Sequence, residues 1–516
     1  MSLGVSVTPA ARLRNATERF LCGGSDNAGP LRILLLFVIA WTAFQTTSFS
    51  SVALHADLTE IFAWSRHPAA SYYKHPPLGA MMGWAWFSVF PVTDWSFHLL
   101  AMTNAAVGLY FTDLIARRYL DRDKRIFVLL FLMLTPFYQF HGQRFASNQT
   151  LLSVWPIATY CFLRAFENRG VLWPVLAGIA AAVAMLGKYY SVYLIAAFPV
   201  AVLLHRDGMR YLRSPAPWIS AAAGFAVLAP HLLWLHANGP QPFNYAFQVH
   251  GHIAFGTALK KSGSYLLGLA GYVALPCAVY ALVVRPGRTA LREAFLPDDP
   301  DRRMLLALLV VPLILPAILS PLLRTSLTPL WSMQAWFLLP IVLLAPPSAE
   351  LPRRALVATA LGVLAVTLAI LAASPFIAWR YHTDGIGDSR EHSDALASEL
   401  TRIWHERFKT PLSIVTGDER LAGAATFYSA DHPDFIFVVG LWTSPWVTPE
   451  RVAREGAAIV CRAADTGYCV QAAQTLGAND QNLQKTEITI ANHFLGSTTR
   501  PDKFLIWLVP PAGSTR

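Results

Sequence analysis

The succession of long apolar segments constrains the fold of this 516-residue chain more than any other feature. A membrane core about 30 Å thick is crossed by roughly 20 apolar residues in a helix. By this criterion we predict about eleven spans, with an upper limit of about 13. The apolar segments occupy residues 31–51, 95–116, 126–140, 150–166, 171–187, 189–204, 216–236, 265–284, 304–320, 329–346 and 355–375.

The composition agrees with a polytopic α-helical membrane protein. Hydrophobic residues make up 54% of the chain and charged residues 14%, and the mean hydropathy is +0.40. A soluble domain carries more charge and less apolar surface than this. The net charge of +10 could indicate binding to nucleic acid. Lysines and arginines are instead scattered in small groups between apolar segments, so we expect membrane lipids and no nucleic acid as partners.

The basic residues predict how the chain is oriented. If the N-terminus is cytoplasmic, the inner loops contain 21 lysines and arginines and the outer loops contain seven. Such an excess is typical of cytoplasmic loops. We therefore expect a cytoplasmic segment over residues 1–30 and a transmembrane domain over 31–375, whose first external loop is 52–94. An odd number of spans places residues 376–516 outside.

The external segment 376–516 has the pattern of an α/β domain, because short β-rich runs alternate with helical ones. Thr448 is expected to cap a helix that has proline at its first position. Cys461 and Cys469 also fall here, and an oxidising compartment would permit a disulfide; we leave bonded and free thiols equally open. The expected strands are Leu412–Thr416, Asp434–Val439, Ala457–Cys461 and Lys503–Val509, and the expected helices are Ser393–Arg407 and Thr448–Glu455.

The first external loop concentrates ionisable side chains at the membrane surface. Asp57 is either the cap of a short helix over Leu58–Ser65 or a catalytic carboxylate, and Glu60 could complete a capping box. Lys74 and His75 are either interfacial anchors or ligand-binding groups. The prolines that follow them fix the backbone and so aim the preceding side chains. The same predicted face carries Tyr73, Arg144, Asn148, Lys188, Tyr189 and His231, together with a His250-Gly-His252 pair that is a weak metal-site signal.

The motifs of this face resemble those of the GT-C superfamily of membrane glycosyltransferases. The resemblance is to the protein-mannosyltransferase-like branch, which includes aminoarabinose-to-lipid-A transferases and rhizobial lipid A or core galacturonosyltransferases. It covers roughly residues 30–350 by the order of the motifs. These motifs are Asp57-Leu-Thr-Glu60, Tyr72-Tyr73-Lys74-His75-Pro76-Pro77-Leu78, Leu186-Gly-Lys188-Tyr189, Pro230-His231-Leu-Leu-Trp234 and the following Phe247-Gln.

This chain departs from the family pattern at three positions. The usual Asp-Glu pair is Asp57-Leu58, so the catalytic Asp of the family is retained. The lysine that usually precedes Pro-Pro is His75, with Lys74 one place earlier. A position that is often Asp in relatives is Asn148. The departures leave the specificity of the resembled enzymes in doubt for this chain.

The resemblance implies inverting transfer of a hexose or pentose from a polyprenyl-phosphate donor to a lipid, lipid A, core-polysaccharide or protein acceptor. It places the reaction at the outer face of a bacterial inner membrane, with the C-terminal domain in the periplasm. It implies Asp57 as the catalytic base and Lys74, His75, Lys188 and His231 as phosphate ligands. Glu60, Tyr73, Arg144, Asn148 and Tyr189 are supporting candidates. No cofactor follows, and a divalent metal is left open.

Two other functions fit a polytopic chain with a charged external face. A transporter or flippase for lipid-linked sugars would show charged mid-membrane helices and a repeat in the span pattern. An O-antigen ligase-type enzyme would have a large external loop between late spans. The sequence shows neither pattern, so a glycosyltransferase is the first hypothesis.

Overall fold

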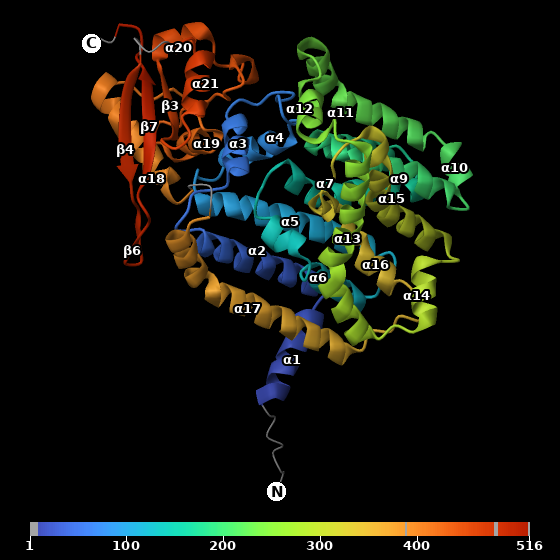
Figure 1. Cartoon of the computed structure of the whole chain (residues 1–516). Coiled ribbons are helices and arrows are strands. Elements are labelled where there is room, and N and C mark those ends of the chain that lie inside the picture. The colour runs from blue at the N-terminus through green and yellow to red at the C-terminus, as the bar shows by residue number, and fades with distance from the viewer. Residues whose placement is uncertain (1–8, 387–389, 479–482, 514–516) are drawn as a thin grey trace.

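The computed structural model describes residues 9–386, 390–478 and 483–513. It consists of a helical body and a smaller sheet domain that lies beyond one end of the helices (Figure 1). The elements of the body are α1 (Pro9–Cys22), α2 (Ala28–Ser48), α3 (Ala56–Ser65), α4 (Leu78–Phe87), α5 (Asp94–Ala116), α6 (Arg122–Leu132), η1 (Phe137–His141), α7 (Ser147–Glu167), α8 (Leu172–Gly187), η2 (Tyr189–Ser191), α9 (Val192–Leu203), α10 (Gly208–Leu212), α11 (Ala216–Asn238), α12 (Gln241–His250), α13 (Phe255–Val284), α14 (Arg288–Phe295), α15 (Pro300–Leu323), η3 (Pro329–Leu338), α16 (Leu339–Leu344) and α17 (Arg353–Asp384).

The apolar segments of the sequence coincide with helices of the body. Within the described part of the chain, six helices are long and apolar enough to cross a membrane, namely α2, α5, α11, α13, α15 and α17. Three shorter apolar helical stretches accompany them, Leu172–Gly187, Tyr189–Leu203 and Pro329–Leu344. The polytopic helical fold is confirmed, whereas the number of spans stays a prediction.

Glycines allow neighbouring helices of the body to approach closely. A Cβ at Gly108 of α5 would lie 2.0 Å from the carbonyl oxygen of Leu152 in α7. A Cβ at Gly178 of α8 would lie 2.1 Å from the carbonyl oxygen of Ser220 in α11. Small residues of this kind let helix backbones make contact within a membrane, where dispersion and hydrogen bonding stabilise association.

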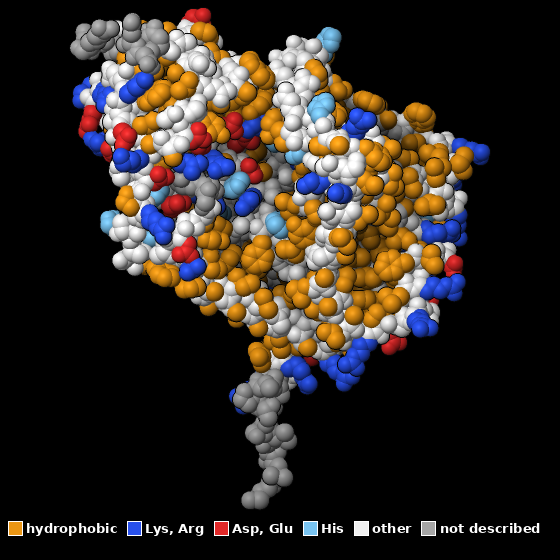
Figure 2. All heavy atoms as spheres, in the orientation of Figure 1, with side chains coloured by type: hydrophobic (Ala, Val, Ile, Leu, Met, Phe, Trp, Pro, Cys, Tyr) orange, Lys and Arg blue, Asp and Glu red, His pale blue; other side chains and the backbone are white. Residues whose placement is uncertain are grey.

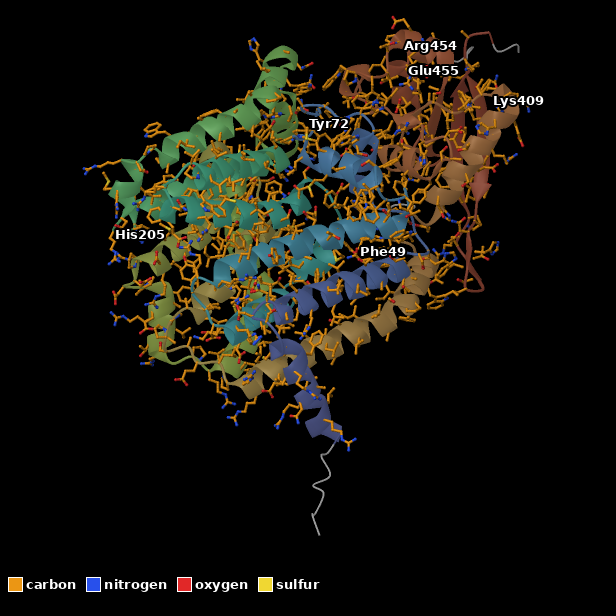
Figure 3. All side chains as sticks on the ribbon, turned by 180° about the vertical axis from the view of Figure 1, so that it is seen from behind. Phe49, Tyr72, His205, Lys409, Arg454 and Glu455 are labelled. Carbon is orange, nitrogen blue, oxygen red and sulfur yellow. A yellow bond between two sulfur atoms is a disulfide. The ribbon has the colours of Figure 1, made fainter. Side chains whose placement is uncertain are left out.

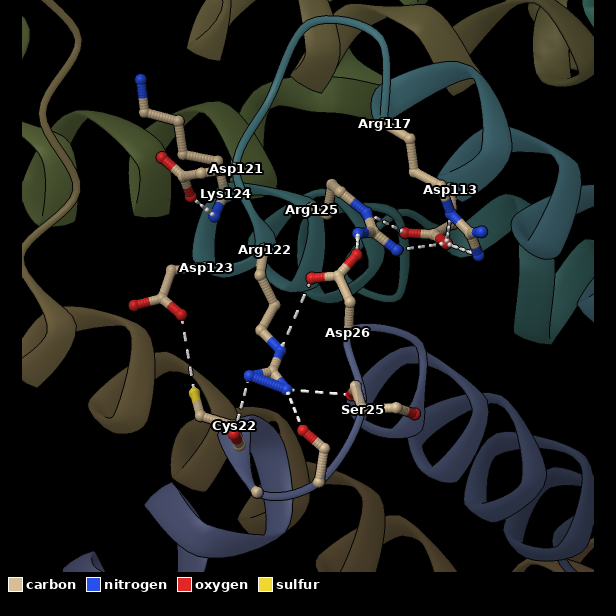
Figure 4. Close-up of polar contacts among 12 residues, drawn as sticks. Cys22, Ser25, Asp26, Asp113, Arg117, Asp121, Arg122, Asp123, Lys124 and Arg125 are labelled. Carbon is tan, nitrogen blue, oxygen red and sulfur yellow. Dashed lines mark hydrogen bonds and ion pairs between the residues drawn. The ribbon is translucent and has the colours of Figure 1, made fainter.

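A cluster of charged side chains lies at the end of the helices opposite the sheet domain (Figure 4). Arg125 pairs with Asp113 through two contacts of 2.9 Å, from Nε to Oδ1 and from Nη2 to Oδ2. Arg117 also binds the Oδ2 of Asp113, at 2.9 Å from Nη2. Asp26 contacts Arg125 and Arg122 and so joins the linker before α2 to α6. We call these five residues the inner ion cluster, after the cytoplasmic side that the basic residues of the sequence predict for this end of the helices.

The sheet domain has a mixed five-stranded sheet in the order β2-β1-β3-β7-β4. Strand β1 is parallel to both β2 and β3, whereas β7 is antiparallel to both β3 and β4. The strands are β1 (Ile414–Gly417), β2 (Asp434–Phe435), β3 (Ala457–Arg462), β4 (Gln484–Ile490) and β7 (Asp502–Val509), with a small separate sheet of β5 (His493–Phe494) and β6 (Ser497–Thr498). The helices are α18 (Arg390–Phe408), α19 (Glu419–Tyr428), η4 (Leu441–Thr443), α20 (Pro449–Glu455) and α21 (Gly467–Thr475).

The predicted α/β character of this domain is confirmed, and the structure adds elements to it. Thr448 caps α20, with its side chain accepting from the Arg451 N–H. Cys461 and Cys469 form a disulfide. The expected strand over Asp434–Val439 forms ladder pairs at its first two residues alone. Strand β4 was not predicted, because this edge strand alternates between polar exposed and partly buried residues.

Helix α19 docks the sheet domain onto the first external loop of the body. The ring of Phe427 packs edge-on against Phe62 of α3, with centroids 5.0 Å apart. The Tyr428 hydroxyl donates to Asp94 at 2.9 Å and accepts from the Leu54 N–H at 2.8 Å. Viewed from behind, Tyr72 of the loop lies beside this domain, whereas His205 lies at the far end of the helices (Figure 3). The loop and the sheet domain therefore form one continuous surface.

Candidate active site

Asp57 lies in the first turn of α3 and is exposed at the junction of the two parts. The helix begins at Ala56, and its N-cap is His55, whose Nδ1 accepts from the Asp57 N–H at 3.2 Å. The expectation that Asp57 caps the helix is wrong, because His55 already fills that position. The Asp57 carboxylate is 51% exposed and lies 3.4 Å from the His55 ring. This carboxylate is accessible to a substrate.

Glu60 and Lys74 form an ion triad with Glu419 of the sheet domain. The Lys74 Nζ lies 2.8 Å from Glu60 Oε1 and 3.1 Å from Glu419 Oε2. It also lies 4.3 Å from the centre of the Phe437 ring. The capping-box role expected of Glu60 is wrong, because its carboxylate is turned to Lys74. Lys74 is no headgroup anchor either, since its side chain is 10% exposed and fully engaged by protein groups.

The electrostatics of this triad keep Lys74 charged. Burial opposes that charge, but the Glu60 and Glu419 carboxylates outweigh it and raise the pKa of Lys74 above its ordinary value. Burial raises the pKa of Glu60 to about 7, although Lys74 acts in the opposite direction. The positive charge of Lys74 is thus compensated by the protein itself.

The segment between α3 and α4 is folded back on itself by Tyr72. The Tyr72 hydroxyl donates to the carbonyl of Trp64 at 3.1 Å, and its ring stacks on the Trp64 ring with centroids 4.9 Å apart. The Tyr72 N–H donates to the His75 carbonyl at 3.1 Å. Tyr73 packs against Phe437 of the sheet domain, with centroids 4.8 Å apart. These contacts of Tyr72 and Tyr73 hold the conformation of the loop before the two prolines that follow His75.

Lys188 lies in the turn between α8 and η2, on the same side of the body. Its Nζ donates to Asn148 Oδ1 at 2.5 Å and lies 5.1 Å from the centre of the Trp331 ring. Burial lowers the pKa of Lys188 to about 8, and the nearby Asp57 carboxylate partly offsets this effect. Among the described residues, no carboxylate lies within 4.0 Å of this ammonium. Lys188 is thus a partly buried cation that none of these carboxylates contacts directly.

His75 adds a neutral imidazole beside Lys188. Burial and the charge of Lys188 lower the pKa of His75 to about 3. His250 lies close enough to contribute to this shift, and its ring packs edge-on against Trp331 with centroids 4.7 Å apart. At neutral pH His75 can donate or accept a hydrogen bond, but it adds no positive charge.

His231 and Tyr189 fasten α11 to the loop. His231 Nδ1 lies 2.9 Å from the Ala70 carbonyl oxygen, which can only accept. The other ring nitrogen, Nε2, therefore accepts from the Tyr189 hydroxyl at 2.9 Å. Both ring nitrogens of His231 are occupied in this arrangement, so the residue positions the loop. Arg144 lies apart from these groups, exposed on a neighbouring pocket that is also lined by His55.

The structure thus divides the predicted site residues into separate groups. Asp57 faces the sheet domain. Lys188 lies within the electrostatic reach of Asp57, and Asn148 and His75 lie close to Lys188. Basic and histidine side chains gather on the face between the sheet domain and the helices (Figure 2). Sequence reasoning missed Glu419 and Trp331, and no local signal marks them, because each meets the site through a distant part of the chain. In the described ranges, no group of three or more His, Cys, Asp or Glu side chains is arranged to hold a metal ion.

The sequence and the fold of the chain are similar to those of known proteins. The family model described as dolichyl-phosphate-mannose-protein mannosyltransferase matches residues 74–234. The crystal structure of ArnT from Cupriavidus metallidurans bound to undecaprenyl phosphate is similar with a TM-score of 0.59 and 14% identity, over 92% of this chain and 97% of that one. Its apo form gives a TM-score of 0.56 and 13% identity over the same shares. No curated protein sequence matches the chain.

The chain has the same fold as the ArnT structures, and its residues 74–234 match the mannosyltransferase family model. The similarity in structure spans both the helical body and the sheet domain, since it covers 92% of the chain. The family model begins at Lys74 and includes His75, Lys188 and His231, whereas Asp57 precedes it. The catalytic role predicted for Asp57 therefore gains no support from the family model and rests on the exposure of its carboxylate and on the loop motif.

Proposed function

We propose that the chain transfers a sugar from a polyprenyl-phosphate donor to a cell-envelope acceptor at the outer face of a bacterial inner membrane. One observation carries the proposal: an exposed carboxylate, Asp57, lies within electrostatic reach of a partly buried ammonium, Lys188, that lacks a carboxylate contact among the described residues. Sugar transfer from a lipid phosphate needs a base on one side of the reacting carbon and a positive charge on the other.

The two groups would serve the two ends of the reaction. The acceptor oxygen forms a bond to the anomeric carbon, and Asp57 takes the proton that this oxygen loses. The bond between the anomeric carbon and the donor phosphate oxygen breaks, and its electron pair leaves with the lipid phosphate. Lys188 stabilises the charge on that phosphate as a point charge, while Asn148 holds the ammonium in place. Displacement from the opposite face inverts the anomeric configuration.

The contacts refine the roles predicted for the other phosphate ligands. We propose that His75 supports the phosphate as a neutral hydrogen-bond donor, in the place where relatives usually have lysine. Lys74 is held by Glu60 and Glu419 and positions the loop against the sheet domain. His231 positions the loop against α11 through its contacts with Ala70 and Tyr189.

Two features support the outer face as the place of reaction. The disulfide between Cys461 and Cys469 fits a domain exposed to an oxidising compartment. The arginines of the inner ion cluster lie at the opposite end of the helices, which fits the cytoplasmic side.

The undecaprenyl phosphate in the ArnT structure supports a polyprenyl-phosphate donor for this fold. The acceptor class extends to lipid A, core polysaccharide, another lipid or protein.

Replacement of Asp57 by Asn tests the proposal. A host strain lacking the chain should lose one sugar from its envelope glycolipids or glycoproteins, as detected by mass spectrometry. The wild-type chain should restore it, whereas Asp57→Asn should reduce transfer by about 10²- to 10⁴-fold, because a general base contributes this much. The variant should retain its melting temperature, since the carboxylate is half exposed.

Glu406→Gln on α18 is the matched control, because its carboxylate is 61% exposed and remote from the loop. This control should restore full transfer. Undiminished transfer by Asp57→Asn would refute the role of Asp57. Detergent-solubilised protein should still glycosylate its acceptor, whereas a flippase would require sealed vesicles.

A further inference from the structure

A polar cavity of about 570 Å³ lies between the start of α3 and the sheet domain. One wall contains His55 and Asp57, which come from the helical body. The opposite wall contains Asp418, Glu419 and Arg420, and it continues through Arg462, Asp465 and Tyr468. The cavity is therefore built jointly by the two parts of the chain, and the candidate catalytic carboxylate lies on its surface.

The topology of the sheet explains why the cavity forms there. In the order β2-β1-β3, the chain leaves β1 toward β2 on one side and later returns to β3 on the other. Ligands of open α/β sheets bind outside the carboxyl ends of the parallel strands, at the point where the strand order reverses. Asp418 directly follows β1, and Arg462 is the last residue of β3. The cavity thus occupies the ligand crevice of this α/β unit.

The wall after β3 is a short loop closed by the disulfide of Cys461 and Cys469. Cys461 lies at the end of β3, Cys469 lies in α21, and Arg462, Asp465 and Tyr468 lie between them. The Asp465 N–H donates to the Arg462 carbonyl at 3.0 Å, which turns the loop. We call residues 461–469 the disulfide loop.

The wall after β1 is fixed by the cap of α19. Asp418 accepts from the Arg420 N–H at 2.9 Å, and its own N–H donates to the Val460 carbonyl of β3 at 2.8 Å. Arg462 lies 3.9 Å from the Asp418 carboxylate across the cavity wall. The two walls are therefore held in register by contacts between neighbouring strand ends, which leaves a preformed polar surface.

Building on the proposed function, we propose that this cavity binds the sugar headgroup of a glycolipid acceptor, with the disulfide loop as its recognition element. Carboxylates of the lining accept hydrogen bonds from sugar hydroxyls, and arginines donate to hydroxyls or phosphates. The ring of Tyr468 is 38% exposed and offers an apolar face to a sugar ring. Bound in this cavity, an acceptor hydroxyl would meet Asp57, while the donor phosphate lies on the side of Lys188.

A binding experiment tests this assignment without turnover. The probe is lipid A, a phosphorylated diglucosamine lipid, and the comparison lipid is phosphatidylglycerol, which is anionic but has no sugar ring. Lipid A should bind the full chain in detergent at least about tenfold more tightly than phosphatidylglycerol. It should also slow hydrogen exchange of the disulfide loop. Arg462→Ala and Tyr468→Ala should each weaken this binding by about tenfold, which corresponds to the loss of one well-placed contact.

Arg402→Ala is the matched control, because Arg402 pairs with exposed glutamates of α18. It should bind lipid A like the wild type. Arg462→Lys retains the charge and should recover part of the affinity, which separates recognition from a folding defect. The assignment is overturned if phosphatidylglycerol binds as tightly as lipid A or if both loop variants bind like the wild type. It is also overturned if a serine-rich peptide, and not the glycolipid, protects the disulfide loop.

The outcome is distinguishable from failure of the proposed function. Asp57→Asn keeps a side-chain oxygen that accepts a hydrogen bond in the cavity wall, so it should reduce transfer far more than the affinity for lipid A, since the arginines and Tyr468 carry the recognition. If Asp57→Asn retains transfer while Arg462→Ala loses binding, the acceptor-binding role of the cavity is supported and the catalytic role of Asp57 is refuted. If Arg462→Ala retains binding while Asp57→Asn loses transfer, the catalytic role stands and the cavity does not.

Discussion

The inner ion cluster and the outer pair of Asp57 and Lys188 are opposite in how their charges are compensated. Inside, Asp113 is fully buried and is held by two arginines, Arg125 and Arg117. At the junction with the sheet domain, Asp57 is exposed beside a histidine, and Lys188 is partly buried against an amide and an indole ring. Both regions are rich in charge at a membrane boundary, so abundance of charge alone does not identify the site.

The difference shows which charges stabilise the fold and which are held ready for a ligand. A buried ion pair with several hydrogen bonds satisfies its own charges, and removing one partner leaves the other stranded. A buried charge without an oppositely charged contact costs stability until a ligand supplies one. We expect substitutions in the inner ion cluster to lower stability and leave activity unchanged. Substitution of Lys188 should lower activity and leave stability unchanged or raised.

The largest effect is expected from Asp113→Asn in the inner ion cluster. This change leaves the guanidinium of Arg125 with less compensation in a buried place. It should lower the free energy of unfolding by about 3 to 5 kcal/mol. Titration with a denaturing detergent measures this loss. Transfer per folded molecule should be unchanged, and a variant of normal stability would contradict the structural role of the cluster.

An effect of opposite kind is expected from Lys188→Met. Without the ammonium, the leaving phosphate loses its charge partner, so kcat/KM for the donor should fall by about 10²-fold. Stability should be maintained or raised, because the change removes a partly buried charge that no carboxylate contacts among the described residues. Melting curves and transfer rates measure the two effects on the same sample. Lys188→Arg keeps the charge and should retain more activity; equal activity of both variants would exclude the phosphate role.

The smallest effect is a pH dependence that Lys188 should impose. Its folded-state pKa of about 8 lies below the value of about 10.4 expected in the unfolded chain. Between these values the unfolded chain binds a proton that the folded chain does not, so stability should rise with pH across this window. Donor binding should weaken over the same range, by at most about tenfold per pH unit. Lys188→Met should lose both trends, and their persistence would assign them to another group.

Much of the helical fold could be predicted from the sequence, because apolar runs of membrane length have few alternatives to a helix. Most of these runs are largely helical, whereas the run over 126–140 is divided between α6 and η1; the Thr448-Pro449 pair marks the start of α20. Strand β4 was not predicted, because this edge strand consists mostly of polar residues that are exposed or only partly buried. The burial of Arg125 was not predicted either, because a basic residue near the end of a span is usually read as a sign of which side of the membrane that end faces.

The candidate site could be predicted in part, because its motif residues lie close together in the first external loop. Asp57, Lys74 and His75 were identified there, but their partners are set by contacts between distant segments. Glu419 reaches Lys74 across 345 residues of chain. A histidine replaced Asp57 as the helix cap, which no cap preference would favour. Local patterns thus identified the reactive loop, and tertiary contacts decided which of its charges are compensated.

The single hydroxyl of Tyr428 has a consequence for the timing of synthesis. It bonds to Leu54 and to Asp94, which lie 374 and 334 residues earlier in the chain. At a translation rate of about 5 to 20 residues per second, roughly 20 to 75 s pass between the emergence of Leu54 and that of Tyr428. During that interval the first external loop lacks the clasp that joins its two ends. The Asp57 carboxylate is therefore made early, but the surface around it is completed only when the last quarter of the protein has been synthesised.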